Sequence, residues 1–412
     1  MERTSKKLSF PKNKIKVLLL ENIHTAAEEI FVSEGYQVMS FNGALSETEL
    51  LAKIKDVSIL GIRSRTILSD KVLDSAERLL AVGTFSIGTN QIDLKAASER
   101  GIAVFNAPYS NTRSVVELAI GGMIALFRRI AEFNSAAHSG RWVKTSSGSH
   151  ELRGKTLGIV GYGNIGSQLS ILAEILGLKV IFYDMSDRLA LGNAVAVNSL
   201  GELLERSDIV SVHVDGRNSN SAMFSHDEFG KMKKGSLFMN LSRGFIVDEE
   251  ALAKFVKSGH IAGAFLDVYQ KEPKSSSEPF KNKLTPFPNV ILTPHIGGAT
   301  EEAQENIGEF VSNKIIQFIN IGSTDLSVNL PNLALPRQEN VHRLIHIHKN
   351  LPGALSKINL LFAEKGANIT GQYLGTMENT GYVITDVDSS YDKELLSKLR
   401  GFPETIRTRV LY

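Results

Sequence analysis

A chain of 412 residues exceeds the size of one typical domain, so we expect two or three domains, each with its own core. Lys and Arg (46) nearly balance Asp and Glu (44), and this predicts neither a nucleic-acid nor a membrane partner. The absence of cysteine excludes disulfides and thiolate metal sites and favours a cytoplasmic protein; we expect no metal ion.

The first 110 residues predict an α/β unit. Residues 1–16 are rich in lysine but lack an apolar core, so we expect a solvated arm rather than a signal sequence. Strands are expected at residues 15–20, 36–41, 59–62, 80–82 and 103–105, with helices at 25–34, 47–55, 69–76 and 94–100. The longest apolar stretch, 115–127, is shorter than the roughly 20 residues of a membrane span and predicts a buried helix between domains or subunits.

A glycine motif opens the next unit. The apolar residues 156–160 lead directly into Gly161-Tyr162-Gly163-Asn164-Ile165-Gly166, and helical spacing follows. Gly161 permits a tight turn, Gly163 lets a pyrophosphate approach the backbone, and Gly166 lets the helix pack on the strand. A second apolar run ends at Asp184, the expected position for the carboxylate that binds the adenosine ribose. This carboxylate favours NAD over NADP, although the nearby Arg188 tempers that preference.

Further strands of this unit are expected near residues 209–214, 236–241, 263–268 and 290–293. The alternation predicts a doubly wound parallel sheet of the Rossmann type, whose ligands bind at the carboxyl ends of the strands. Arg243 and His295 each follow such a strand. A guanidinium can hold a carboxylate with two hydrogen bonds, and an imidazole can exchange a proton near neutral pH. Glu272 becomes the partner of His295 if its loop brings the two together; taken alone, it predicts a solvated surface charge.

The end of the chain predicts a small third domain. Residues 331–336, with a proline at each end, indicate a linker. Beyond it, strands at 342–348, 368–374, 381–387 and 405–411 and helices at 353–365 and 392–399 give a β-α-β-β-α-β series of the ferredoxin-like kind. His342, His346 and His348 would share one face of a strand, so a metal site there is an open alternative.

Together these motifs resemble the D-isomer-specific 2-hydroxyacid dehydrogenases. The similarity covers nearly the whole chain and is carried by six motifs and a C-terminal domain of the ACT type. The motifs are Arg63-Ser64-Arg65-Thr66, Gly88-Thr89-Asn90-Gln91-Ile92-Asp93, Asn106-Ala107-Pro108, the Gly161 turn, Asn240-Leu241-Ser242-Arg243-Gly244 and Thr293-Pro294-His295-Ile296-Gly297-Gly298.

The resemblance implies a fold, a cofactor and a catalytic set. A Rossmann-type NAD domain (111–297) is then inserted in a flavodoxin-like substrate domain (1–110 and 298–330), and an ACT regulatory domain (337–412) follows. The catalytic residues would be Arg243, Glu272 and His295, with His295 exchanging the proton of the substrate hydroxyl. NAD would be bound by Gly161, Gly163, Asn164, Ile165, Gly166, Asp184, Leu241, Ser242, Asp267 and Gly298, with Asp267 holding the nicotinamide carboxamide.

The resemblance also implies a substrate and an effector. Arg63 and Arg65, with Lys144 as a weaker candidate, would bind the phosphate of 3-phosphoglycerate, and a side activity on 2-oxoglutarate is possible within the family. His348, Asn350 and Asn368 match an L-serine site formed between paired ACT domains, in an assembly that is commonly a homotetramer. Asp215 stands where many relatives have proline, and the sequence assigns it no function.

Two alternatives stay open. One is a dehydrogenase of the same class that acts on glyoxylate, hydroxypyruvate or another unphosphorylated acid. The other is a non-catalytic NAD-sensing corepressor or scaffold built on this fold. The paired arginines and the ACT domain disfavour both.

Overall fold

The computed structural model describes residues 11–273, 278–338, 341–388 and 393–411. The chain divides into two compact units, one made of residues 1–110 and 304–412 and the other of residues 111–303. Most of the predicted N-terminal arm lies outside the described residues, and the division into three domains stays a prediction. Short 3-10 turns occur at Lys12–Lys14, Ile54–Asp56, Asn218–Asn220 and Gly244–Ile246.

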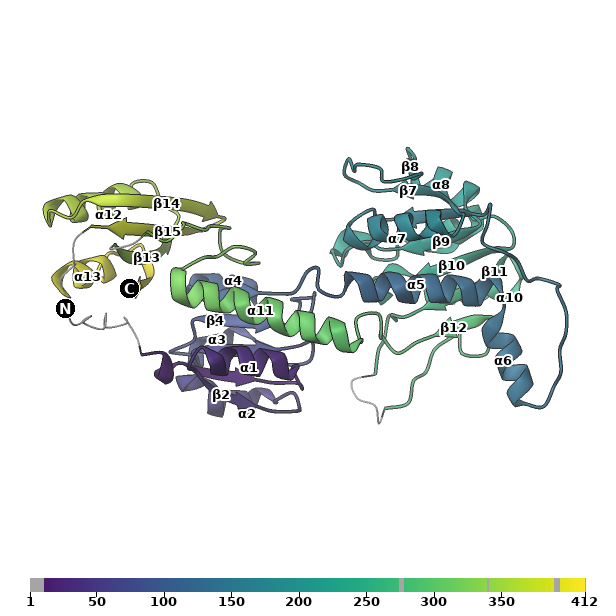
Figure 1. Cartoon of the computed structure of the whole chain (residues 1–412), viewed down its shortest axis with the longest axis horizontal. Helices are drawn as coiled ribbons and strands as arrows, with labels where there is room; N and C mark the ends of the chain where they lie inside the picture. Colours follow the sequence, from purple (N-terminus) through teal and green to yellow (C-terminus); the bar gives the residue numbers. More distant parts are fainter. Residues whose placement is uncertain (1–10, 274–277, 339–340, 389–392, 412) are drawn as a thin grey trace, which may run out of the picture. The chain divides into compact units, whose positions relative to one another are not determined.

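The first unit contains a five-stranded parallel sheet in the order β2-β1-β3-β4-β5. Helices α1 and α11 cover one face and α2, α3 and α4 the other (Figure 1). This is the flavodoxin-like order, whose strand order reverses between β1 and β3. The strands are β1 (Lys16–Leu19), β2 (Gln37–Ser40), β3 (Ile59–Ile62), β4 (Ala81–Thr84) and β5 (Ala103–Phe105); the helices are α1 (Thr25–Ser33), α2 (Glu47–Lys53), α3 (Asp70–Ser75), α4 (Leu94–Glu99) and α11 (Glu301–Ile321).

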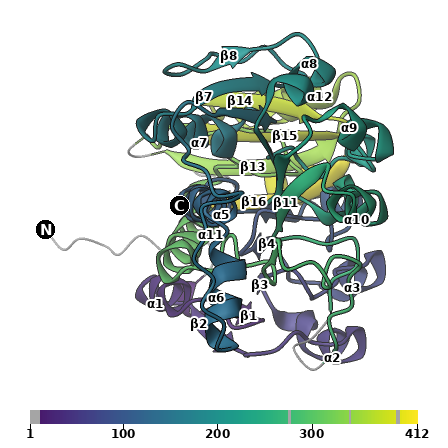
Figure 2. The same cartoon turned by 90° about the vertical axis from the view of Figure 1, so that its right-hand side faces the viewer.

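The second unit contains a seven-stranded parallel sheet in the order β12-β11-β10-β9-β6-β7-β8. Helices α5 and α7 pack on one face, and α8, α9 and α10 pack on the other (Figure 2). The strands are β6 (Thr156–Val160), β7 (Lys179–Tyr183), β8 (Val195–Ala196), β9 (Ile209–Val212), β10 (Ser236–Asn240), β11 (Ile261–Leu266) and β12 (Val290–Leu292). The helices are α5 (Thr112–Phe127), α6 (Ile130–His138), α7 (Asn164–Ile175), α8 (Leu200–Arg206), α9 (His226–Lys231) and α10 (Glu249–Lys257).

Both sheets confirm the predicted α/β fold class. Their central strands are buried on both faces, which is why they form continuous apolar runs in the sequence rather than alternating ones. The strand order of the second sheet reverses between β6 and β9, so the glycine turn after β6 lies at the point where open α/β sheets bind ligands. Among the described residues, no helix combines the length and the apolar content that a membrane crossing requires.

The C-terminal part of the first unit is an antiparallel sheet in the order β14-β15-β13-β16, as the β-α-β-β-α-β pattern predicts. Residues along β13 alternate between two environments. Leu344 packs under α12 and α13, whereas Ile345 and Ile347 join a core that also contains residues of α1, α11 and β5. The elements are β13 (His342–Lys349), α12 (Ala354–Glu364), β14 (Ile369–Met377), β15 (Thr380–Val387), α13 (Lys393–Arg400) and β16 (Thr405–Leu411).

A buried ion pair reinforces this attachment. Arg343 binds Asp386 through two hydrogen bonds of 2.7 Å, and the two side chains are almost fully buried. The same guanidinium donates to the carbonyl of Ile321 at the end of α11 (3.0 Å) and to that of Leu335 in the predicted linker (2.8 Å). Arg409, on β16, donates to two more carbonyls near the end of α11. Arginine therefore joins the C-terminal sheet to the helix beneath it.

Removing the acid of the buried pair should destabilise the first unit. We expect Asp386→Ala to lower its free energy of unfolding by about 3 kcal/mol or more, because the variant leaves the buried Arg343 charge without a counter-ion. Urea unfolding followed by circular dichroism measures the change. The control is Lys95→Gln, which breaks an exposed i,i+4 pair with Glu99 on α4 of the same unit and should cost less than about 1 kcal/mol. Equal effects of the two variants would contradict this view of the pair.

Candidate active site

The glycine turn between β6 and α7 has the form that a dinucleotide requires. Gly161 has a φ of +92°, and a side chain there would begin 2.7 Å from the carbonyl oxygen of His213. A side chain on Gly166 would begin 2.3 Å from the carbonyl oxygen of Gly161, whereas nothing lies within 4 Å of the corresponding position at Gly163. The turn is thus closely packed at Gly161 and Gly166 and open at Gly163. At the open side, the first amides of α7, including those of Asn164 and Ile165, are available to an anion.

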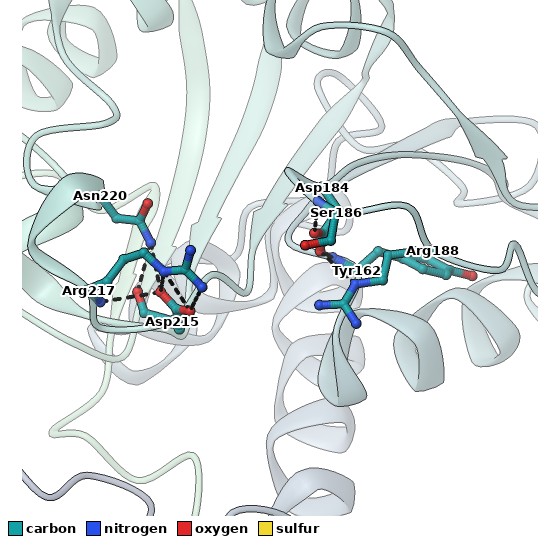
Figure 3. Close-up of polar contacts among 7 residues, drawn as sticks. All are labelled: Tyr162, Asp184, Ser186, Arg188, Asp215, Arg217 and Asn220. Carbon is teal, nitrogen blue, oxygen red and sulfur yellow. Dashed lines mark hydrogen bonds and ion pairs between the residues drawn. The ribbon is translucent and has the colours of Figure 1, made fainter. Parts of the chain in front are cut away.

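Asp184 lies beside this turn at the end of β7. One of its carboxylate oxygens accepts from the amide of Tyr162 (2.8 Å), the other from the amide of Ser186 (2.9 Å), and Arg188 approaches to 3.5 Å (Figure 3). The stacking of Tyr162 on Phe182, with ring centroids 3.7 Å apart, holds the turn against β7. These residues fit the ribose and diphosphate of NAD, since the carboxylate is held in place and would repel a 2′-phosphate.

The loop after β10 presents Arg243. The fully buried Asn240 accepts hydrogen bonds from the amide and hydroxyl of Ser242 (3.1 and 2.8 Å) and donates to the carbonyl of Arg243 (3.0 Å). A side chain on Gly244 would begin 1.8 Å from the carbonyl oxygen of Tyr269, so glycine is required where this loop meets the one after β11. Burial lowers the pKa of Arg243, and the charges of Glu272 and Asp215 oppose that shift. The guanidinium is therefore partly desolvated and suited to bind an anion.

The loop after β12 presents His295 on a turn that Asp267 organises. Asp267 is buried, and its carboxylate accepts from the Thr293 hydroxyl (2.6 Å) and from the amides of Ile296 (2.8 Å) and Gly297 (2.7 Å). His295 itself has a φ of +55°, a backbone conformation that a non-glycine residue adopts only where its surroundings enforce it. The nicotinamide role of Asp267 stays a prediction; its visible role is to hold the histidine turn.

Glu272 and His295 form a hydrogen-bonded pair. The distance from His295 Nδ1 to Glu272 Oε2 is 2.9 Å, and Tyr269 donates its amide to Glu272 Oε1 (3.3 Å). The Glu272 carboxylate raises the pKa of His295 despite partial burial. Burial is the largest influence on Glu272 and acts to raise its pKa, but the hydrogen bond and charge of His295, with the Tyr269 amide and the Arg243 charge, together lower the pKa. With Nδ1 engaged, Nε2 is the nitrogen available to exchange a proton with a bound molecule.

Arg63 and Arg65 belong to the first unit, in the loop after β3. The side chain of Glu21, which follows β1, is almost fully buried and accepts from the amides of Arg63 (3.2 Å), Arg65 (3.0 Å) and Thr66 (2.8 Å). β1 and β3 flank the point where the order of this sheet reverses. Burial lowers the pKa of Arg63, and the charge of Glu21 opposes that shift. Glu21 was not predicted from the sequence, where its only signal is an acid two residues after the buried strand β1.

Lys144 lies on an exposed segment between α6 and β6, and among the described residues no hydrogen bond or ion pair joins it to Arg243, Glu272 or His295. Of the other predicted cofactor residues, Leu241 and Ser242 lie in the buried Arg243 loop, and Gly298 closely approaches Asn111.

The predicted serine residues lie at two ends of the C-terminal sheet. Asn350 follows β13, and its amide donates to the carbonyl of Asn379; Asn368 precedes β14, and its carbonyl accepts from the amide of Asp388. Because β15 spans from Thr380 to Val387 between them, the two asparagines are roughly 25 Å apart. His348 is buried and stacks on His346, with ring centroids 5.4 Å apart. Within the described ranges, no group of three His, Cys, Asp or Glu residues could hold a metal ion.

Comparison with known proteins points in one direction. Residues 120–297 match the family model described as the NAD-binding domain of D-isomer specific 2-hydroxyacid dehydrogenases, and residues 344–407 match an ACT domain like that of the AHAS small subunit. The D-3-phosphoglycerate dehydrogenase of Dictyostelium discoideum is 48% identical over 404 residues, which cover 98% of this chain and 99% of that protein. The Escherichia coli K12 protein of the same name is 49% identical over 409 residues, which cover 98% and 100%.

A solved structure shares most of the fold. The D-lactate dehydrogenase of Aquifex aeolicus, in complex with NAD and lactic acid, has a TM-score of 0.64 and 26% identity to this chain. The alignment covers 74% of this chain and 97% of that protein.

The Glu272–His295 pair makes a testable prediction about protonation. Since the Glu272 carboxylate raises the pKa of His295, the imidazolium persists to higher pH than it otherwise would, and Glu272→Gln should make His295 lose its proton at lower pH. An NMR titration of the His295 ring measures the change. Glu250→Gln, in an exposed pair with Lys254 on α10, is the matched control and should leave the titration unmoved. A His295 pKa in Glu272→Gln as high as in the wild type would contradict the view that the Glu272 carboxylate raises the pKa of His295.

Proposed function

Because the chain belongs to the D-isomer-specific 2-hydroxyacid dehydrogenases, which are NAD-dependent oxidoreductases, we propose that it is a D-3-phosphoglycerate dehydrogenase. It would oxidise 3-phospho-D-glycerate to 3-phosphohydroxypyruvate, the reaction that opens L-serine biosynthesis. The observation that carries this proposal is the 2.9 Å pair of Glu272 and His295 on the NAD-binding unit, beside the partly desolvated Arg243. Reduction of 2-oxoglutarate is a proposed side activity of the same site.

Each side chain of the site has a separate role in the proposed reaction. NAD, when bound, supplies the acceptor for the hydride of the substrate C2. Neutral His295 takes the proton of the C2 hydroxyl on Nε2, while Glu272 at Nδ1 stabilises the imidazolium that results. Arg243 holds the substrate carboxylate through its planar guanidinium. In the reverse direction, protonated His295 returns the proton to the keto oxygen.

The phosphate of the substrate is the proposed ligand of Arg63 and Arg65. Their backbone is held by Glu21, and two guanidinium groups suit a dianion better than one. An unphosphorylated acid would leave these cations without a partner. The substrate's phosphate is therefore the feature that separates this proposal from a glyoxylate or hydroxypyruvate reductase, and Lys144 stays a weaker candidate for the same role.

Steady-state kinetics test the proposal directly. Hydroxypyruvate phosphate should be reduced with NADH at a higher kcat/KM than hydroxypyruvate, glyoxylate or 2-oxoglutarate. Arg63→Gln should raise the KM for hydroxypyruvate phosphate by about tenfold to a hundredfold, because it removes a charged hydrogen bond, and should change that for hydroxypyruvate little. Lys71→Gln, in an exposed pair with Glu47 of the same unit, is the control. Preference for an unphosphorylated acid would refute the assigned substrate, and absence of turnover with intact NADH binding would favour an NAD sensor.

We also propose that L-serine inhibits the enzyme through the ACT domain. Asn350 and Asn368 are roughly 25 Å apart in one chain, so one serine molecule can contact both only where two copies of the domain meet. The proposed assembly is accordingly a homotetramer with paired ACT domains. A phosphorylated substrate does not cross lipid unaided, and this supports a cytoplasmic enzyme.

The shared serine site predicts complementation between variants. Asn350→Ala and Asn368→Ala should each raise the serine concentration for half-inhibition by about tenfold, without changing kcat in the absence of serine. Co-expression of the two variants should recover part of the sensitivity, because a mixed pair holds one intact site and one doubly altered site. Equal loss in the mixed protein would contradict a site shared by two chains, and a wild-type rate indifferent to serine would contradict the effector itself.

A further inference from the structure

The loop after β9 contains a side-chain cluster that the proposed reaction leaves unused. β9 and β6 are the neighbours between which the strand order reverses, so the glycine turn after β6 and the loop after β9 open on the same crevice. The two loops are in close contact. A side chain on Gly161 would begin 2.7 Å from the carbonyl oxygen of His213 and 2.8 Å from the amide of Val214.

Asp215, Arg217 and Asn220 form this cluster (Figure 3). The Arg217 Nε lies 2.8 and 2.9 Å from the two carboxylate oxygens of Asp215. The buried Asn220 donates to both the carboxylate and the backbone carbonyl of Asp215 at 3.0 Å. Asn220 thus holds Asp215 in place, and Asp215 in turn holds Arg217. The Arg217 side chain is 57% exposed, so its guanidinium can still contact a bound molecule.

The cluster lies between the two ends of the cofactor site. On one side, a side chain on Gly216 would begin 3.4 Å from Nε of Arg243. On the other side, His213 and Val214 at the start of this loop contact the glycine turn, whose Tyr162 amide donates to Asp184 (2.8 Å). Asp184 is the proposed partner of the adenosine ribose, and Arg243 holds the substrate beside the nicotinamide. NAD would span these two residues, and the diphosphate lies in the middle of that molecule.

We propose that Arg217, positioned by Asp215 and Asn220, binds the diphosphate of the dinucleotide. The inference rests on the proposed placement of NAD across the crevice. A planar guanidinium matches phosphate oxygens, and a negatively charged diphosphate benefits from a fixed cation beside the amides of the glycine turn. The competing explanation is that Arg217 only neutralises Asp215, whose carboxylate would otherwise repel the cofactor.

A double-mutant cycle on cofactor binding separates these explanations. NADH binding to the full-length protein, without substrate, is measured by its fluorescence for wild type, Arg217→Gln, Asp215→Asn and the double variant. Arg217→Gln should raise the Kd by about tenfold, the usual effect of losing a charged hydrogen bond. In the Asp215→Asn background, the same substitution should still weaken binding by at least about threefold, because Arg217 itself contacts the diphosphate.

Several outcomes would overturn the proposed role of Arg217. If Arg217→Gln has no effect once Asp215 is neutral, or changes the Kd less than twofold in the wild-type background, Arg217 does not bind the cofactor. ADP-ribose retains the diphosphate but lacks nicotinamide, so it should lose the same factor as NADH; an unchanged affinity for ADP-ribose would also overturn the proposal.

One control variant and the wild-type measurement keep the inference distinct from the proposed function. Arg206→Gln breaks a comparably exposed ion pair on α8 and should leave the Kd unchanged. Wild-type protein that fails to bind NADH would overturn the placement of the cofactor and Arg217 with it. Wild-type binding together with an inert Arg217→Gln would overturn only the role of Arg217.

Discussion

The hydrogen bonds that Asp267 accepts from the turn after β12 are the interaction on which the rest of the site depends. They hold His295 in a left-handed backbone conformation and direct its ring toward Glu272, which the loop after β11 carries. Three donors satisfy the buried Asp267 carboxylate, because each donor replaces a lost water contact. The proposed proton transfer would thereby depend on a residue that need not touch the substrate.

The same construction recurs in the other unit. The buried Glu21 holds the Arg63 loop as Asp267 holds the His295 turn, and each of these acids lies within two residues of the end of a strand of a parallel sheet. A loop that leaves a buried strand has backbone amides without strand partners, and an acid at the strand end can satisfy several of them at once. Each sheet therefore supplies a rigid support from which a cationic or proton-exchanging side chain projects. The C-terminal sheet is joined to the first unit differently, through Arg343 and through an apolar core shared with α11.

Much of this could be predicted from residue order. Buried parallel strands form continuous apolar runs, so the positions of Asp184, Arg243 and His295 at strand ends follow from the sequence. The pairing of Glu272 could not be predicted in this way, because Glu272 lies in a polar loop without periodicity. Its contact with His295 depends on how two loops from neighbouring strands fold. The roles of Glu21 and Asn240 are still harder to predict, since they come from the backbone amides that these residues bind. The sequence does not distinguish them from any other acid or amide near a strand end.

The sequence by itself determined the α/β class, the glycine turn with its acidic partner and the residue types available for catalysis, because periodicity and spacing are local properties. Only the tertiary structure decided that Glu272 lies 2.9 Å from His295 and that Asp267 and Glu21 hold the loops of His295 and Arg63. It also decided that Asp215 fixes Arg217 in the loop after β9, and that Asn350 and Asn368 lie at opposite ends of one sheet. These contacts join residues from different strands and loops, and such distances follow from packing and strand register rather than from separation along the chain.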